Sequence, residues 1–123
     1  MEGFHLYVWK MEDTRRPLYW EITAYIEGPC LEVLLKDEED RYLRFIRTTL
    51  FVFNNKTSKF PVEIKNLEGL IVEAVESPDH KYGFLVKHRD GIYPEKSYFF
   101  KEKETQQEWL RFLSDFKTES IYN

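Results

Sequence analysis

The sequence predicts a mainly β domain that ends in one amphipathic helix. Apolar, β-branched and aromatic residues come in short runs that turn-forming residues separate, which is typical of strands. The period changes once, near the end, where Trp109 and four further apolar residues cover one face of a helix. A short helix is marginal alone, so we expect it to cover an apolar surface of the sheet that precedes it.

The strands are expected wherever these runs occur between turn residues. Turn chemistry stands at residues 28–29, 37–40, 54–55, 68–69, 77–79 and 90–91. The expected strands are residues 4–9, 18–26, 30–35, 42–47, 49–53, 62–65, 70–75, 82–88 and 97–101.

The helix is expected to begin at or just before Thr105, because Thr105 and Glu108 have the spacing of a capping box. It should run for about three turns. One face then carries Trp109, Leu110, Phe112, Leu113 and Phe116, and the other carries Arg111, Ser114, Asp115 and Lys117.

The length and composition indicate one folded, intracellular domain. The 123 residues suffice for a single core. The net charge of -4 disfavours nonspecific nucleic-acid binding. A single cysteine, Cys30, points to a reducing compartment, and the apolar run at residues 4–9 is too short for a signal peptide or a membrane span. We therefore expect a cytoplasmic protein in which Cys30 is an inert core residue.

No motif in the sequence predicts catalysis. The chain lacks the short patterns of hydrolases, zinc proteases, phosphate-binding loops and dinucleotide-binding folds. The acidic run at residues 37–40 has neither the length nor the glycine of a calcium loop, and the three histidines are scattered. We expect no catalytic residue, no metal and no cofactor. Trp9 and Trp20 are expected to be structural.

Five segments resemble the pleckstrin-homology (PH) domain, whose seven-stranded, partly open antiparallel barrel is capped by one C-terminal α-helix. Residues 41–53 look like its second and third strands, and residues 61–69 like its fourth strand and the following turn. Residues 82–86, 97–101 and 104–110 resemble its last two strands and its helix. The resemblance implies a PH-like fold over roughly residues 28–116 and a non-catalytic module.

A narrower likeness concerns residues 22–24, 27–28, 48–51 and 108–109, which are similar to the N-terminal domain of signal-transducing adaptor proteins. It divides the chain into an N-terminal extension at residues 1–26, a PH-like domain at residues 27–117 and a flexible tail at residues 118–123. An alternative alignment starts the barrel at Glu2. The alignment that starts at Cys30 is preferred, because the alternative inserts too many residues before Thr48, and a mixture of the two stays open.

The resemblance also implies where a phosphoinositide headgroup would bind. Members that bind one carry a Lys before the first loop and further bases after it, because several phosphates need several fixed donors. Lys36 and Arg41 fit the first and last of these positions, but Glu39 stands at the middle one. Residues 36–47 carry four positive and four negative charges, which argues against tight, specific binding.

Lys56 and Lys59 are the other candidate headgroup ligands, since they lie in a segment with little acidic charge. Well-placed bases attract an anionic membrane by about 1 kcal/mol each. The expected function is a signalling adaptor module that is recruited to a weakly bound anionic lipid, at the plasma membrane, or to a protein partner such as a component of a tyrosine-kinase pathway. The alternative is a peptide-binding domain of the phosphotyrosine-binding or EVH1 type, in which a peptide adds to the sheet edge beside the helix.

Overall fold

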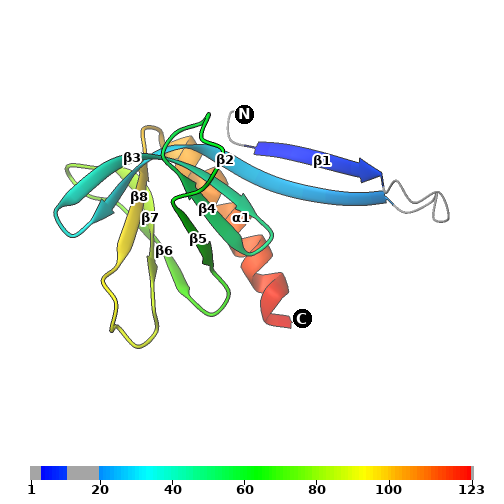
Figure 1. Cartoon of the computed structure of the whole chain (residues 1–123). Coiled ribbons are helices and arrows are strands. Elements are labelled where there is room, and N and C mark those ends of the chain that lie inside the picture. The colour runs from blue at the N-terminus through cyan, green and yellow to red at the C-terminus, as the bar shows by residue number, and fades with distance from the viewer. Residues whose placement is uncertain (1–3, 11–19, 123) are drawn as a thin grey trace.

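The computed structural model describes the backbone of residues 4–10 and 20–122 and the side chains of residues 25–114. Within that range eight strands precede one helix (Figure 1). They are β1 (Phe4–Lys10), β2 (Trp20–Leu34), β3 (Asp37–Ile46), β4 (Thr49–Phe53), β5 (Glu63–Asn66), β6 (Ile71–Val75), β7 (Tyr82–Lys87), β8 (Lys96–Phe100) and α1 (Lys103–Tyr122).

Seven of the strands form one curled antiparallel sheet in the order β5-β4-β3-β2-β8-β7-β6, and β1 pairs with β2 off this path. β2 is the earliest of these seven strands in the sequence and β8 is the last. The curl of the sheet brings them side by side, and Leu31–Leu34 pairs with residues 96–99. The helix packs against β7 and β8. The predicted fold class, a PH-like half-barrel capped by a C-terminal helix, is confirmed.

The predicted strand break at Gly28 and Pro29 is wrong, because β2 runs unbroken through both residues. Between Ile26 and Leu31, β2 is paired with β3 on one side. On the other side, among the described residues, its pairing with β1 stops at Ile26 and its pairing with β8 starts at Leu31. A proline is tolerated where one side of a strand has no partner, since its missing N–H then costs no ladder hydrogen bond. The same continuity carries the strand across the predicted boundary between residues 26 and 27.

The predicted loop at residues 37–40 is also wrong. These four acidic residues begin β3, and the chain reverses at Leu35 and Lys36, with Leu34 paired to Asp37. Leu35 adopts a positive φ of 56°, as such tight hairpin turns require. All four acidic side chains are exposed, so their charges stay hydrated and the strand can continue through them.

The other strands match the prediction within about two residues. The helix starts two residues before Thr105, which therefore lies inside its first turn, and it continues to Tyr122. It is longer than the predicted three turns and includes residues 118–122 of the predicted tail. The predicted strand at residues 18–26 forms the first half of β2 from Trp20 onward, while residues 18–19 lie outside the described residues.

The core is built around Trp109, which has 0% of its surface exposed. Its ring stacks on Phe84 of β7 and Phe100 of β8, with centroid distances of 5.9 and 5.5 Å. Phe112 and Leu113 are buried on the same helix face, and Arg111 and Ser114 are exposed on the other. The predicted apolar face of the helix is thus confirmed for the described side chains.

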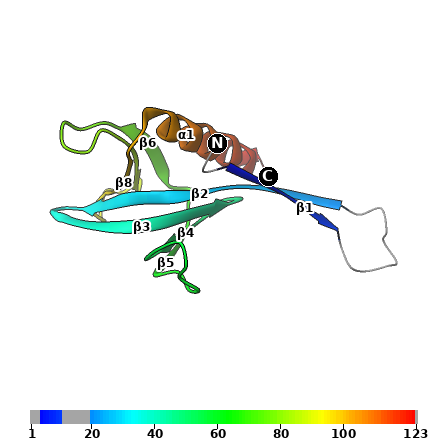
Figure 2. The same ribbon diagram turned by 90° about the horizontal axis from the view of Figure 1, so that it is seen from above.

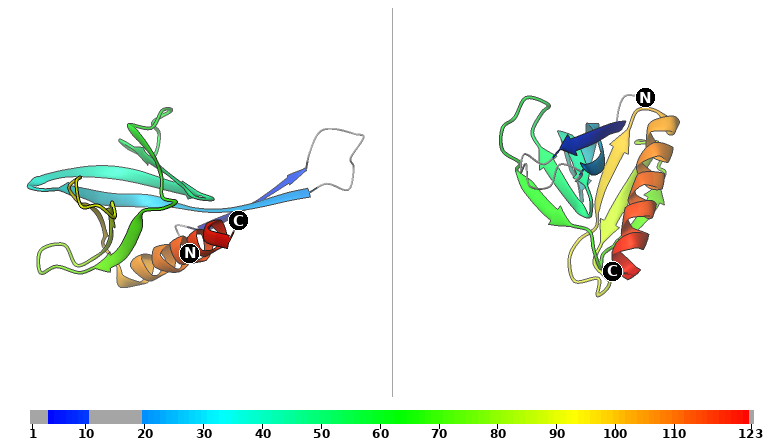
Figure 3. Two further views of the ribbon diagram at one scale, coloured as in Figure 1. Left: turned by 90° about the horizontal axis from the view of Figure 1, so that it is seen from below. Right: turned by 90° about the vertical axis from the view of Figure 1, so that its right-hand side faces the viewer.

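The N-terminal strands form an arm that extends beyond the curled sheet (Figures 1 and 2). β1 pairs with Trp20–Ile26 in a continuous seven-residue register, and β3 reaches β2 only from Tyr25 onward. The predicted N-terminal extension therefore adds one strand to β2. Figure 3 shows α1 on the side of β2 away from β4 and β5.

Candidate functional site

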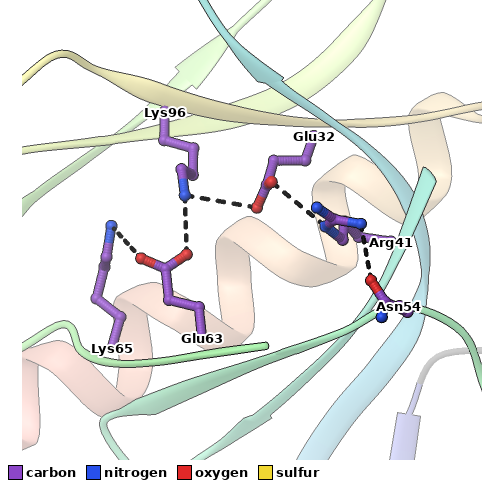
Figure 4. A network of polar contacts seen from close by, with 6 residues as sticks. All are labelled: Glu32, Arg41, Asn54, Glu63, Lys65 and Lys96. Atoms are coloured by element: carbon purple, nitrogen blue, oxygen red, sulfur yellow. Dashed lines mark hydrogen bonds and ion pairs between the residues drawn. The ribbon is translucent and has the colours of Figure 1, made fainter. Parts of the chain in front are cut away.

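A group of charged side chains lies together on the inner face of the curled sheet, next to apolar core residues. Glu32, Arg41, Glu63 and Lys96 come from β2, β3, β5 and β8, and Lys65 lies two residues beyond Glu63 (Figure 4). Strand alternation puts them on the inner face with the core residues, because Arg41 precedes Leu43 by two positions and Glu32 follows Cys30 by two. We call these five residues the interior charge cluster.

Each member of the interior charge cluster has an oppositely charged neighbour. Lys96 Nζ lies 2.9 Å from Glu63 Oε1 and 3.7 Å from Glu32 Oε2. Arg41 Nε lies 3.4 Å from Glu32 Oε1, and its Nη1 donates to Asn54 Oδ1 at 2.9 Å. Lys65 Nζ is 3.4 Å from Glu63 Oε2. The three cations and two anions leave a net charge of +1, and every cation already has an anionic partner that a ligand would have to displace.

The cluster also determines the protonation of its neighbours. Burial raises the pKa of the Tyr98 hydroxyl and that of the Cys30 thiol, and the nearby carboxylates raise both further. Cys30 therefore stays a protonated thiol at neutral pH, which makes it a poor nucleophile. Burial alone would raise the pKa of Glu63, but hydrogen bonds and charge from Lys96 and Lys65 outweigh it and hold that pKa below its ordinary value of 4.5.

The lowered pKa of Glu63 predicts a pH-dependent contribution to stability. A carboxyl whose folded pKa is depressed stabilises the fold above its unfolded pKa and loses that effect as pH falls through the folded pKa. We expect Glu63→Gln to lower the unfolding free energy by less than about 1 kcal/mol at pH 7, since the pair is partly solvated. Urea titrations at pH 7, 5 and 3 should show the difference from wild type shrinking at the lowest pH.

The matched control for Glu63 is Glu68→Gln, because Glu68 is exposed and forms no ion pair with the described residues. Its substitution should change the unfolding free energy equally little at all three pH values. A Glu63→Gln deficit that stayed constant from pH 7 to pH 3 would show that its carboxylate charge contributes nothing.

A hollow of about 520 Å³ lies beside the interior charge cluster. Its walls come from the middle of β2, the middle of β3 and the loop after β4. Asn55 shapes that loop, since its Oδ1 accepts from the backbone N–H and the hydroxyl of Thr57. The residues around the hollow are Gly28, Pro29, Asp40, Arg41, Tyr42, Asn54, Asn55 and Lys56.

The structure brings together two of the four predicted headgroup ligands. Arg41 and Lys56 both line the hollow. Lys36 lies in the β2–β3 turn, five positions from Arg41 and so about 17 Å away along the extended strand. Lys59 is exposed in the loop before β5 and does not line the hollow. The four bases therefore do not form one site. Asp40 adds a negative charge next to Arg41 and Lys56, the two bases that line the hollow.

Sequence reasoning missed Glu32 and Lys96 as members of one site. Glu32 lies within the expected strand at residues 30–35, and Lys96 immediately precedes the expected strand at residues 97–101. The available signal was strand alternation, which places a charged residue at an inward position in each case. In the part of the chain that the structure describes, no group of three or more His, Cys, Asp or Glu side chains is arranged to hold a metal ion. No helix there is long and apolar enough to cross a membrane.

Comparisons with known proteins identify the fold. Neither the protein-family models nor the curated protein sequences give a match. Among solved structures, an activated truncation of Vav1 in its apo form is 20% identical with a TM-score of 0.66, over 76% of this chain and 26% of that one. The chain thus spans about a quarter of that Vav1 structure.

Two isolated PH domains match over most of their own length. The carboxyl-terminal PH domain of pleckstrin is 15% identical with a TM-score of 0.60, over 72% of this chain and 90% of that one. The N-terminal PH domain of human ARAP2 is 13% identical with a TM-score of 0.59, over 78% and 81% of the two chains. Identities this low show the fold alone, and none of these matches is with an adaptor of the predicted kind. The chain has the fold of a PH domain.

Proposed function

We propose that this domain is a non-catalytic recruitment module of a cytoplasmic signalling adaptor and that its main ligand is a protein. The observation that carries the proposal is the pairing of Arg41, the base best placed for a phosphoinositide, with Glu32 at 3.4 Å and Asn54 at 2.9 Å. A ligand phosphate would have to displace both partners. PH domains act as binding modules for membrane lipids or proteins, and this arrangement favours the second class.

Weak attraction to an anionic membrane is the second part of the proposal. Lys56 and Lys59 are exposed in the loop after β4, and bases of this kind add about 1 kcal/mol each near an anionic surface. Lys36 and Arg41 contribute less, because Lys36 adjoins the acidic start of β3 and Arg41 is ion-paired. The lipid therefore acts as a modest, salt-sensitive aid to plasma-membrane association, and no cofactor takes part.

Co-sedimentation with vesicles tests the lipid part. We expect weak binding to phosphatidylcholine vesicles containing phosphatidylserine at low salt, no gain from adding a few per cent of a phosphoinositide, and loss of binding near 0.5 M salt as charges are screened. Lys56→Glu with Lys59→Glu should reduce the bound fraction several-fold. The matched control is Lys81→Glu with Lys101→Glu, at exposed lysines outside this loop.

Two outcomes would overturn this ranking of ligands. One is tight binding that depends on a phosphoinositide and survives 0.5 M salt. The other is loss of vesicle binding on substitution of Arg41 but not of Lys56 and Lys59. Either would make the lipid headgroup the principal ligand of the domain.

The phosphotyrosine-binding or EVH1 mode stays a prediction. It requires a free sheet edge near the helix, and β6 is the edge strand on that side of the path. The Gln106 amide of α1 donates to the Val75 carbonyl of β6, and Glu73 of β6 pairs with Lys87 at 3.5 Å. A peptide that adds there should shift the NMR signals of β6 and α1, whereas a peptide bound elsewhere should leave them in place.

A further inference from the structure

The outer face of the β2–β5 half of the sheet is unusually apolar. An antiparallel sheet normally buries one face and exposes a polar one. Here the inner face carries Leu43, Leu50 and Val52, all 0% exposed, yet the outward positions of the same strands are also largely apolar. Six outward apolar residues, counting Val62 just before β5, lie on neighbouring strands: Pro29, Tyr42, Phe51, Phe53, Val62 and Ile64. We call these six residues the outer apolar face.

Strand pairing assembles the outer apolar face into two neighbouring rows. One row joins Phe53 of β4 to Tyr42 of β3 and Tyr42 to Pro29 of β2. The other joins Ile64 of β5 to Phe51 of β4, and Phe51 to Arg44 of β3. Val62 precedes Ile64 by two positions and so extends the first row. The rows lie side by side and form one continuous surface.

Part of this surface is open to solvent, whereas Tyr42 and Phe53 are only 8% and 7% exposed. Val62 and Ile64 are 51% and 62% exposed, and Phe60, two positions before Val62, is 81% exposed. Contiguous exposed apolar patches on soluble domains commonly mark interaction sites.

The charges within the face cancel. Arg44 Nη2 lies 3.4 Å from Glu27 Oε2, and the Arg44 guanidinium lies 5.2 Å from the centre of the Phe53 ring. Tyr42 donates its hydroxyl hydrogen to the same Glu27 carboxylate at 2.5 Å. A face of aromatic side chains with one fixed arginine and no net charge has the composition of a protein interface and offers little attraction to an anionic bilayer.

The hollow adjoins this surface and supplies a place for an anchor. Pro29 and Tyr42 belong both to the outer apolar face and to the wall of the hollow, and Lys56 stands exposed at its rim. Interfaces commonly seat one large side chain in such a depression, with charged groups around it. The charged residues around the hollow are Asp40, Arg41 and Lys56, with a net charge of +1, and Arg41 is already paired with Glu32, so the complementary group is a single carboxylate that faces Lys56.

We propose that the outer apolar face and the adjoining hollow together dock a protein segment that carries an apolar anchor residue beside an acidic one. The segment's apolar side chains pack on Val62, Ile64 and Phe51, its anchor enters the hollow, and its carboxylate pairs with Lys56. This deepens the proposed function by naming the partner's chemistry and rests on that function.

Selection from a library of random 12-residue peptides displayed on phage, panned against the 123-residue chain, tests this assignment. Enriched peptides should share an apolar residue next to Asp or Glu. When synthesised and titrated by fluorescence polarisation, they should lose about tenfold in affinity on Val62→Ser with Ile64→Ser, because apolar contact is lost. Lys56→Glu should weaken binding several-fold, and more at low salt than at high salt.

The controls make the same exchanges at exposed positions outside the surface. Leu35 and Ile92 are 78% and 74% exposed, so Leu35→Ser with Ile92→Ser should leave the affinity unchanged. Lys101→Glu should likewise have no effect. Circular dichroism melting of each variant shows whether it folds, and little change is expected since the replaced side chains are mostly solvated.

Four results would overturn the proposal. If the peptides bind the Val62→Ser, Ile64→Ser variant as tightly as wild type, the site lies elsewhere and protein recruitment stays intact. If no peptide is enriched, the proposed function fails as well. Vesicle binding that the same variant abolishes assigns the face to the membrane. A dimer in analytical ultracentrifugation that the variant dissociates assigns the face to a second copy of the chain.

Discussion

Trp109→Ala should lower the unfolding free energy by about 3–5 kcal/mol, the usual cost of removing a fully buried large aromatic side chain. Trp109 contacts Phe84 and Phe100 by stacking and joins α1 to β7 and β8. Its removal therefore opens a cavity where helix and sheet meet. Urea titration followed by circular dichroism measures the loss, since tryptophan fluorescence is itself changed by the substitution.

The control is Gln107→Ala, at an exposed position of the same helix. It should change the unfolding free energy by less than about 0.5 kcal/mol. Trp109→Phe should cost less than Trp109→Ala, because it keeps a stacking ring and because the indole N–H has no hydrogen-bond partner to lose in the described structure. Equal effects of alanine at 107 and 109 would mean that α1 does not stabilise the sheet.

Gly83→Ala should also destabilise the fold, although it adds only one carbon atom. A Cβ at Gly83 would clash with the Tyr98 carbonyl oxygen and would lie 2.7 Å from Phe99 Cδ1. The first contact is with backbone of the neighbouring strand β8, so relief requires the two strands to separate. Overpacking of this kind costs about 1–3 kcal/mol or more, and thermal unfolding should show a melting temperature lower by several degrees.

Gly28→Ala is the matched control, because a Cβ there meets nothing within 4 Å and the residue has no positive φ. The same chemical change in another strand of the sheet should leave the melting temperature within about 2 °C of wild type. A Gly83 variant as stable as the Gly28 variant would show that the close approach of β7 and β8 relaxes without cost.

The strands and the helix were predictable because their signals are local. The run at residues 49–53 and the face around Trp109 each carry their periodicity within a few residues, and both were predicted correctly. The predicted break at Gly28 and Pro29 is wrong for a non-local reason. The strand tolerates the proline because, among the described residues, β2 pairs with β1 only up to Ile26 and with β8 only from Leu31.

The site was far less predictable than the fold. The candidate bases were chosen by their spacing to the resembled family, and spacing does not reveal that Arg41 lies beside Glu32 or that Lys96 reaches Glu63 from another strand. Those pairs depend on the register of four strands. The outer apolar face had a visible signal in the near-continuous apolar run of β4, which is typical of a strand covered on both faces.

The pairing of β2 with β8 also bears on how the domain folds. Leu31–Leu34 finds its second neighbour, at residues 96–99, only after nearly the whole sheet has been synthesised. Closing so large a loop costs chain entropy before the contact repays it, which slows folding in topologies of this type. During synthesis, one side of this apolar part of β2 therefore stays without its native neighbour until β8 has emerged from the ribosome.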